Sequence, residues 1–198
     1  MARPSRFDAG VLLDAALRLA ADGGPAAVTM AAVAKSAGAP SGSVYHRFAH
    51  RPALLAALWL RTLDDFQSGL LTALDGDEPR AAALAAARHA VRWSRERPEA
   101  ARVLRYGPAD FGRAHWPADA ERALAAANER LFAALSDLTD RLGATGEADR
   151  ERVLVAVVDM PYALVQRHLR QGVPVPAHAL GTVEECAAAL LPAGGGGR

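Results

Sequence analysis

Residues Thr29 to Phe48 read TMAAVAKSAGAPSGSVYHRF, and this stretch decides the fold of the N-terminal part of the chain. Thr29 has a hydroxyl side chain that favours a helix N-cap, and Gly38 is suited to end that helix. Pro40 suits the first turn of a second helix because proline lacks the N–H that would be unpaired there. Two short helices joined by a glycine-bearing turn are typical of a helix-turn-helix.

The second of these helices, about residues 40–48, has one apolar side and one polar side. Val44 and Phe48 can pack with Val33 and Ala37 of the preceding helix, forming a small core. The remaining side chains have too many polar ends to be buried together. A single α-helix fits the DNA major groove, which is about 12 Å wide, so this pattern predicts a DNA-recognition helix.

Three side chains of this helix are candidates for contacts at or near base edges. They are Ser41, Ser43 and His46, and Gly42 is included in the predicted DNA-binding set. A plain surface position is the alternative for His46.

Four further side chains are candidates for the sugar-phosphate backbone. Thr29 can place its hydroxyl and a helix N-terminus at a phosphate, and Tyr45 can stack on the backbone and donate its hydroxyl. Arg47 and Arg51 add positive charge. The alternatives are packing for Tyr45 and a solvated basic face for the two arginines.

Outward from this stretch, apolar residues recur at three- and four-residue intervals and predict an all-α fold. Helices are expected at about 8–22, 30–37, 40–48, 52–75, 79–97, 98–106, 118–142, 147–171 and 177–191. Pro161 should kink the helix over 147–171, residues 107–117 should be irregular, and residues 173–176 should be an extended connector.

The string VTMAAVAKSAGAPSGSVYHRFAHRPALLAAL, residues 28–58, resembles the N-terminal signature of TetR-type transcriptional regulators. The resemblance covers about residues 8–60, and it departs from many relatives at Pro40–Ser41. It implies a homodimer with one recognition helix per subunit. It also implies a helix-turn-helix DNA-binding domain over 1–51 and a larger helical domain for effector binding and dimerisation over 52–193. The glycine-rich composition of residues 194–198 predicts a disordered tail.

A regulator of this kind must respond to a signal such as a small-molecule ligand. Aromatic and thioether side chains commonly line the apolar pockets that bind such ligands. The residues predicted to line an effector pocket are Trp93, Tyr106, Phe111, His115, Trp116, Met160, Tyr162 and His168. Core packing or a surface position is the alternative for each of them. For ligand binding to change DNA affinity, the ligand must bind the DNA-competent and DNA-incompetent states with different affinities.

Dimerisation is expected to use the last two long helices of the chain. Their apolar faces include Val153, Leu154, Val157, Val158, Leu164, Val183, Ala187 and Leu190. Packing inside one subunit is the alternative for each position.

Charge is distributed unevenly although the whole chain has a formal net charge of only +1. Residues 1–61 carry seven Lys or Arg against three acidic residues, whereas the rest carries 16 against 19. The N-terminal part therefore has the positive field that attracts a polyanion such as double-stranded DNA. No apolar run is long enough for a membrane span, and the single cysteine, Cys186, cannot form an internal disulfide; both observations favour a cytoplasmic protein. Cys186 itself is expected to be a small buried residue.

The leading interpretation is a repressor that a small molecule releases from its operator. An activator with the same DNA-binding module is the first alternative, and an architectural DNA binder fits the near-neutral chain poorly. An enzyme is the other class considered, but the six histidines are scattered and no catalytic, phosphate-binding or metal-binding motif is present. No cofactor and no metal are expected.

Overall fold

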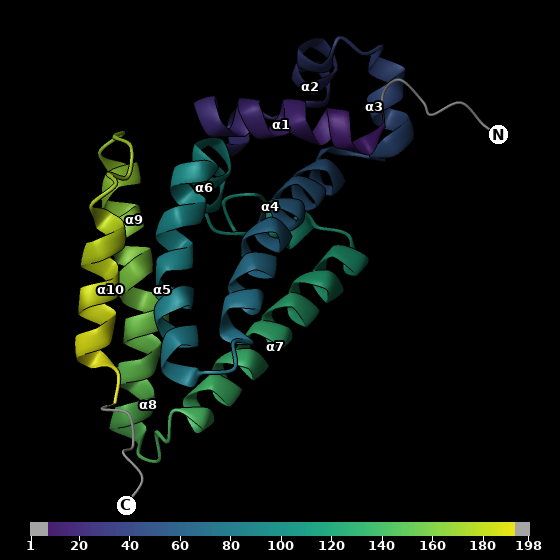
Figure 1. The fold of residues 1–198 in the computed structure, drawn as a ribbon. Helices are drawn as coiled ribbons and strands as arrows, with labels where there is room; N and C mark the ends of the chain where they lie inside the picture. The colour runs from purple at the N-terminus through teal and green to yellow at the C-terminus, as the bar shows by residue number, and fades with distance from the viewer. Residues whose placement is uncertain (1–7, 193–198) are drawn as a thin grey trace, which may run out of the picture. The chain divides into compact units, whose positions relative to one another are not determined.

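The computed structural model describes residues 8–192, and this part of the chain is helical without β-strands (Figure 1). The helices are α1 (Ala9–Gly23), α2 (Met30–Ala37), α3 (Ser41–Arg47), α4 (Arg51–Leu74), α5 (Pro79–Glu96), α6 (Pro98–Leu104), α7 (Ala118–Arg141), α8 (Glu147–Leu154), α9 (Met160–Arg170) and α10 (Ala179–Leu190). The all-α prediction is confirmed. The predicted disordered tail lies outside the described residues.

Most helix ends follow from local chemistry at the positions expected from the sequence. Asp8 accepts a hydrogen bond from the Val11 N–H at 3.0 Å at the start of α1, and Glu78 caps α5 in the same way. Gly38 ends α2 with φ +64°, a left-handed conformation that glycine adopts without a steric penalty. Pro40 is the N-cap of α3 rather than its first helical residue, because its ψ of 141° is extended.

Pro161 acts differently from the expected simple kink. A π-helical segment, Val155–Asp159, separates α8 from α9, and the Met160 N–H donates to the Val155 carbonyl across it. Because proline cannot donate to the preceding turn, the chain accommodates it with one wider turn. The single predicted helix over 147–171 is therefore divided.

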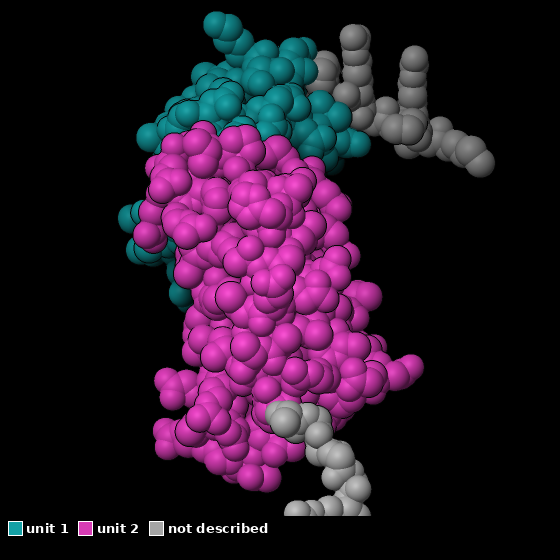
Figure 2. Space-filling model, turned by 60° about the vertical axis from the view of Figure 1, so that its left-hand side comes forward, with its two compact units in different colours: residues 1–63, 99–125 teal, residues 64–98, 126–198 magenta. Residues whose placement is uncertain are grey.

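The chain divides into two compact units, coloured separately in Figure 2. Unit 1 contains residues 1–63 and 99–125, and unit 2 contains residues 64–98 and 126–198. The chain passes from one unit to the other within α4, after the first residue of α6, and within α7. This division differs from the functional boundary predicted at residue 51, because residues 52–63 and 99–125 pack with the N-terminal helices.

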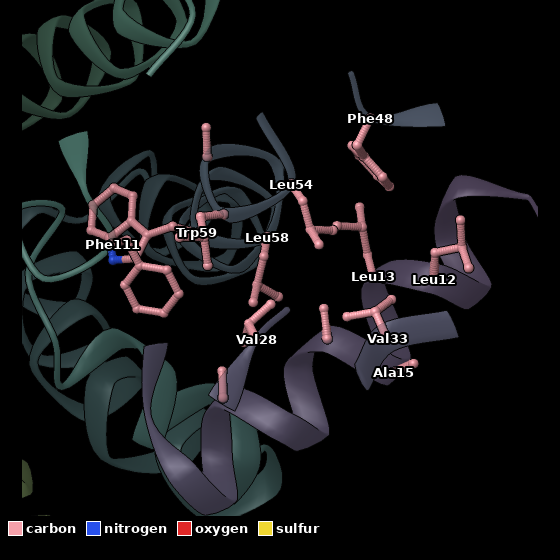
Figure 3. Close-up of a cluster of buried hydrophobic side chains, with 14 of the residues drawn as sticks. Leu12, Leu13, Ala15, Val28, Val33, Phe48, Leu54, Leu58, Trp59 and Phe111 are labelled. Carbon is pink, nitrogen blue, oxygen red and sulfur yellow. The ribbon is translucent and has the colours of Figure 1, made fainter. Parts of the chain in front are cut away.

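The core of unit 1 joins the helix-turn-helix to α4 and to the segment after α6. Figure 3 shows Leu12 of α1, Val33 of α2 and Leu54 of α4 in one apolar cluster, with Phe111 and Trp59 in the same cluster. All five are buried. Burial of a large apolar side chain contributes roughly 1.5–3 kcal/mol, so this core fixes the short helices α2 and α3, which would not be stable alone.

Unit 2 has its own core, in which α5 packs against α9 and α10. Alanines at 82, 83, 86 and 87 are all buried, and their small side chains let neighbouring helices approach closely. Arg80 donates to the carbonyls of Ala188 and Pro192, both at 2.7 Å, so it ties the end of α10 to α5. Among the helices of residues 8–192, none combines the length and apolar character of a membrane span.

Candidate nucleic-acid interface

Helix α3 is anchored by its apolar side and leaves the rest of its surface exposed. Val44 is fully buried and Phe48, just after the helix, is nearly so. Ser41, Gly42, Tyr45, His46 and Arg47 are exposed, and Ser43 is partly exposed. The small core predicted between α2 and α3 is present, and the residues expected to meet DNA lie on the opposite surface.

Tyr45 is the most conspicuous residue on this surface. Its side chain is 57% exposed although it is large and aromatic. A packing role was the alternative for this residue, and this degree of exposure does not support it. An exposed aromatic ring with a terminal hydroxyl is well suited to stacking on a sugar-phosphate backbone while donating to a phosphate.

Thr29 is the N-cap of α2, as expected. Its Oγ1 accepts a hydrogen bond from the Ala32 N–H at 3.1 Å, and the residue itself is exposed. The hydroxyl hydrogen is not used in that contact, so Thr29 can still donate to a phosphate at the N-terminus of the helix.

Arg51 is the first residue of α4 and has contacts that the sequence did not predict. Its Nε donates to the Val28 carbonyl and its Nη2 donates to the Pro25 carbonyl, both at 2.7 Å. Residues 25–27 form a 3₁₀ turn between α1 and α2. The guanidinium therefore joins the start of α4 to the turn before α2, a long-range contact with no local sequence signal.

The residues predicted to line an effector pocket divide evenly between the two units. Tyr106, Phe111, His115 and Trp116 belong to unit 1, and Trp93, Met160, Tyr162 and His168 belong to unit 2.

In unit 1 the structure supports core packing for two of these residues. Phe111 has no exposed surface, and Trp116 is buried with its indole N–H donating to the Phe111 carbonyl at 2.9 Å. Tyr106 is partly buried, with its ring against Phe111, and His115 is exposed.

In unit 2, Met160 packs partly against the core, and His168 contacts the Leu164 carbonyl through Nδ1 at 2.9 Å. Tyr162 is 55% exposed. Trp93 is buried, and its indole N–H donates to the Asp65 carboxylate at 2.8 Å.

Trp93 also lines a recess between α4 and α5, within unit 2, with a volume of about 530 Å³. The recess is lined by Asp65, Ser68, Gly69, His89, Arg92, Trp93, Glu96 and Arg97. Arg97 pairs with Asp65 at 2.9 Å. Sequence reasoning identified only Trp93 here, because charged residues on helices are usually solvated.

His89 forms the buried wall of this recess. Its Nε2 lies 2.9 Å from the Phe66 carbonyl, which can only accept, so Nε2 carries the hydrogen. Burial lowers the pKa of His89 below its ordinary value of 6.5, and the charges of Arg92 and Arg97 lower it further against the opposing effects of Phe66 and Glu96. The ring is therefore neutral near pH 7, with Nδ1 a buried acceptor that has no partner within the described chain.

The residues proposed for dimerisation fall on both sides of their helices. Val153, Val157, Val183 and Ala187 are buried in the core of unit 2, so the expectation that they face a second subunit is corrected. Leu154 is 41% exposed, and Val158, Leu164 and Leu190 are partly exposed. Cys186 is exposed rather than buried, because α10 turns it away from the helices that it packs against.

Comparison with known proteins gives a family match at the N-terminus and fold matches over the whole chain. Residues 12–58 match the model of the bacterial regulatory proteins of the tetR family. A TetR family transcription regulator from Marinobacter aquaeolei VT8 has a TM-score of 0.71 at 21% identity, covering 92% of this chain and 94% of that protein.

Two further solved structures show the same fold. PfmR, a TetR family regulator from Thermus thermophilus, has a TM-score of 0.68 at 17% identity, covering 93% and 96% of the two chains. The fatty acid degradation regulator FadR from Bacillus halodurans has a TM-score of 0.68 at 15% identity over the full length of both chains. No curated protein matches the sequence.

Proposed function

Because residues 12–58 match the model of the tetR family of bacterial regulatory proteins, we propose that this chain is a DNA-binding transcriptional regulator of that family. More specifically, we propose a homodimeric repressor that a small molecule releases from its operator. The observation that carries the proposal is the surface of α3, which exposes Tyr45, His46 and Arg47 while Val44 anchors the helix. Regulators of this family are transcription factors, so an enzymatic function is not proposed.

DNA recognition by two such surfaces sets a geometric condition. Recognition helices of a dimer must be about 34–36 Å apart to enter successive major grooves on one face of the duplex. A ligand that changes this separation lowers operator affinity, and a ligand with equal affinity for both states has no effect. The continuous helices α4 and α7 each contribute residues to both units, so they provide covalent routes for such a change.

The recess beside Trp93 is where we propose that the effector binds. Its volume of about 530 Å³ is within the usual range of about 300–1,000 Å³ for small-molecule sites. It combines the indole of Trp93, a neutral imidazole at His89 and the exposed cation of Arg92. The likeness to FadR concerns the fold, so it does not identify the ligand.

Dimerisation is proposed through the outer faces of α8, α9 and α10. Leu154 and Tyr162 are large apolar residues left exposed there, and such residues mark interaction surfaces when they gather on one face. Sedimentation of Leu154→Glu and Tyr162→Glu should show weakened dimers. Phe132→Glu is the matched control, because Phe132 is 68% exposed on α7.

The operator test begins with selection of bound DNA from a random pool, followed by a thermal-shift ligand screen. A selected palindromic site whose affinity falls when a hit is added supports the repressor proposal. Transcription in vitro from a promoter carrying that site separates repression from activation, and uniform binding to all sequences would instead indicate an architectural protein. Loss of ligand binding in Trp93→Phe and Arg92→Gln, with retention in Trp116→Phe, would support the recess as the effector site.

A further inference from the structure

Arg51 holds together the two flanks of the helix-turn-helix. Val28 and Pro25, whose carbonyls accept its hydrogen bonds, lie just before α2, and Arg51 begins α4 just after α3. All of α2, the turn and α3 therefore lie between the two points that this one guanidinium joins. Both contacts are short, as expected for charge-assisted hydrogen bonds.

The segment held in this way is the one that sets the start of α2. Val28 is fully buried, its N–H donates to the Pro25 carbonyl at 3.2 Å, and Thr29 directly after it caps α2. Helix α3 has only seven residues and is anchored mainly by Val44 and Phe48. A helix this short has little stability of its own, so its orientation depends on what holds its flanks.

We propose that Arg51 is a positioning residue for DNA recognition, which acts by fixing the α1–α2 turn to the start of α4 and so sets the orientation of α3. Its main role is then this internal clamp rather than the phosphate contact expected from its charge. The inference rests on DNA recognition by α3 but not on repression or on any effector.

The clamp needs the shape of the guanidinium and not only its charge. Nε and Nη2 are donors at fixed positions in one plane, and they reach two different carbonyls at once. A lysine ammonium is a flexible point charge that serves a phosphate well but does not reproduce this paired contact. Arg51→Lys therefore removes the paired hydrogen bonds of the clamp while it keeps the positive charge that attracts DNA phosphates.

The experiment measures operator affinity over a range of salt concentrations for wild type, Arg51→Lys and Arg51→Gln. We expect both variants to bind about tenfold more weakly, the loss typical of a hydrogen bond to a charged group, and we expect Arg51→Lys to keep the wild-type salt slope. In the DNA-free protein, both variants should exchange the amide hydrogens of Val28 and Thr29 faster than wild type.

Arg61→Lys is the matched control. Arg61 also lies on α4, but its partners are Asp14 at 2.8 Å and the Gly10 carbonyl, both in the N-terminal part of unit 1 and away from the flanks of α3. Because exposed ion pairs contribute little, its affinity should stay within about twofold of wild type.

Two results would overturn the proposal. One is wild-type affinity for Arg51→Lys together with a salt slope reduced by about 0.9 for Arg51→Gln, which is the signature of a phosphate contact alone. The other is unchanged amide exchange at Val28 and Thr29 in Arg51→Lys.

If a variant does not fold, the clamp can still be tested by a direct measurement on the wild-type protein. The Arg51 Nε–H should give a slowly exchanging NMR signal with contacts to Val28, and a rapidly exchanging signal would overturn the clamp. If the wild-type protein selects no operator, the proposed function fails, whereas this signal and the amide exchange still report on the clamp.

Discussion

The indole N–H of Trp59 on α4 donates to the carbonyl of Tyr106 at 3.2 Å, and this contact ties the segment after α6 to the core that holds the helix-turn-helix. The Trp59 ring also lies 5.9 Å from that of Trp116. Residues far apart in the sequence thereby join the same compact unit as α1, α2 and α3.

Trp59→Phe should lower the free energy of unfolding by about 1–3 kcal/mol. The substitution removes the indole N–H that donates to the partly buried Tyr106 carbonyl, and the smaller ring leaves a void in the core. Urea denaturation followed by circular dichroism measures the change. Phe132→Leu, at an exposed position on α7, should shift the midpoint little, and an equal shift in both variants would show that the Trp59 contact is not special.

Gly38→Ala should destabilise the protein by about 1 kcal/mol, whereas Gly42→Ala should stabilise it by up to about 1 kcal/mol. Gly38 has φ +64°, which strains any residue with a Cβ, while Gly42 is helical and open space surrounds the position of its Cβ. Thermal melting of the two variants gives the comparison. Gly42→Ala should also weaken operator binding because the added methyl group meets the DNA, and unchanged affinity would exclude close approach at Gly42.

Tyr45→Ala should weaken DNA binding to all sequences without lowering stability by more than about 0.5 kcal/mol. The ring is mostly exposed, so its loss leaves no cavity. Tyr45→Phe keeps the stacking surface and should lose less affinity. Binding isotherms on operator and on random DNA test this, and a loss confined to the operator would assign Tyr45 to base recognition instead.

Lowering the pH from 7.5 to below 6.5 should destabilise the protein through His89. The pKa of His89 is lower in the folded protein than in the unfolded chain, so the unfolded chain binds a proton first as the pH falls. The contribution of His89 to the free energy of unfolding is therefore fully present above about pH 6.5 and is lost below it. The slope for this one group is at most about 1.4 kcal/mol per pH unit.

His89→Gln should lose that part of the pH dependence. Denaturant unfolding at several pH values compares the variant with wild type, and parallel profiles would mean that His89 does not contribute. His178→Gln is the control, since this N-cap residue is exposed at the start of α10.

The sequence by itself determined the short helices of the N-terminal part and the exposed polar surface of α3, because these depend on local signals. The caps at Thr29 and Gly38, the apolar pair Val44 and Phe48, and the polar residues between them all depend on neighbours within a few positions. Helix periodicity likewise placed α2 at its observed ends. These features follow from backbone hydrogen bonding and side-chain size, which act over one or two turns.

Only the tertiary structure decided which face of each element is used and which distant atoms meet. Both faces of the last helices are partly apolar, so the sequence did not show that Val153 and Val183 face the core while Leu154 and Tyr162 face outward. The Arg51 contacts span 23 and 26 residues, and the sequence assigned that guanidinium to DNA phosphates. A charged side chain has several possible partners of similar chemistry, and only the packed positions of the backbone carbonyls show which ones lie within hydrogen-bond distance.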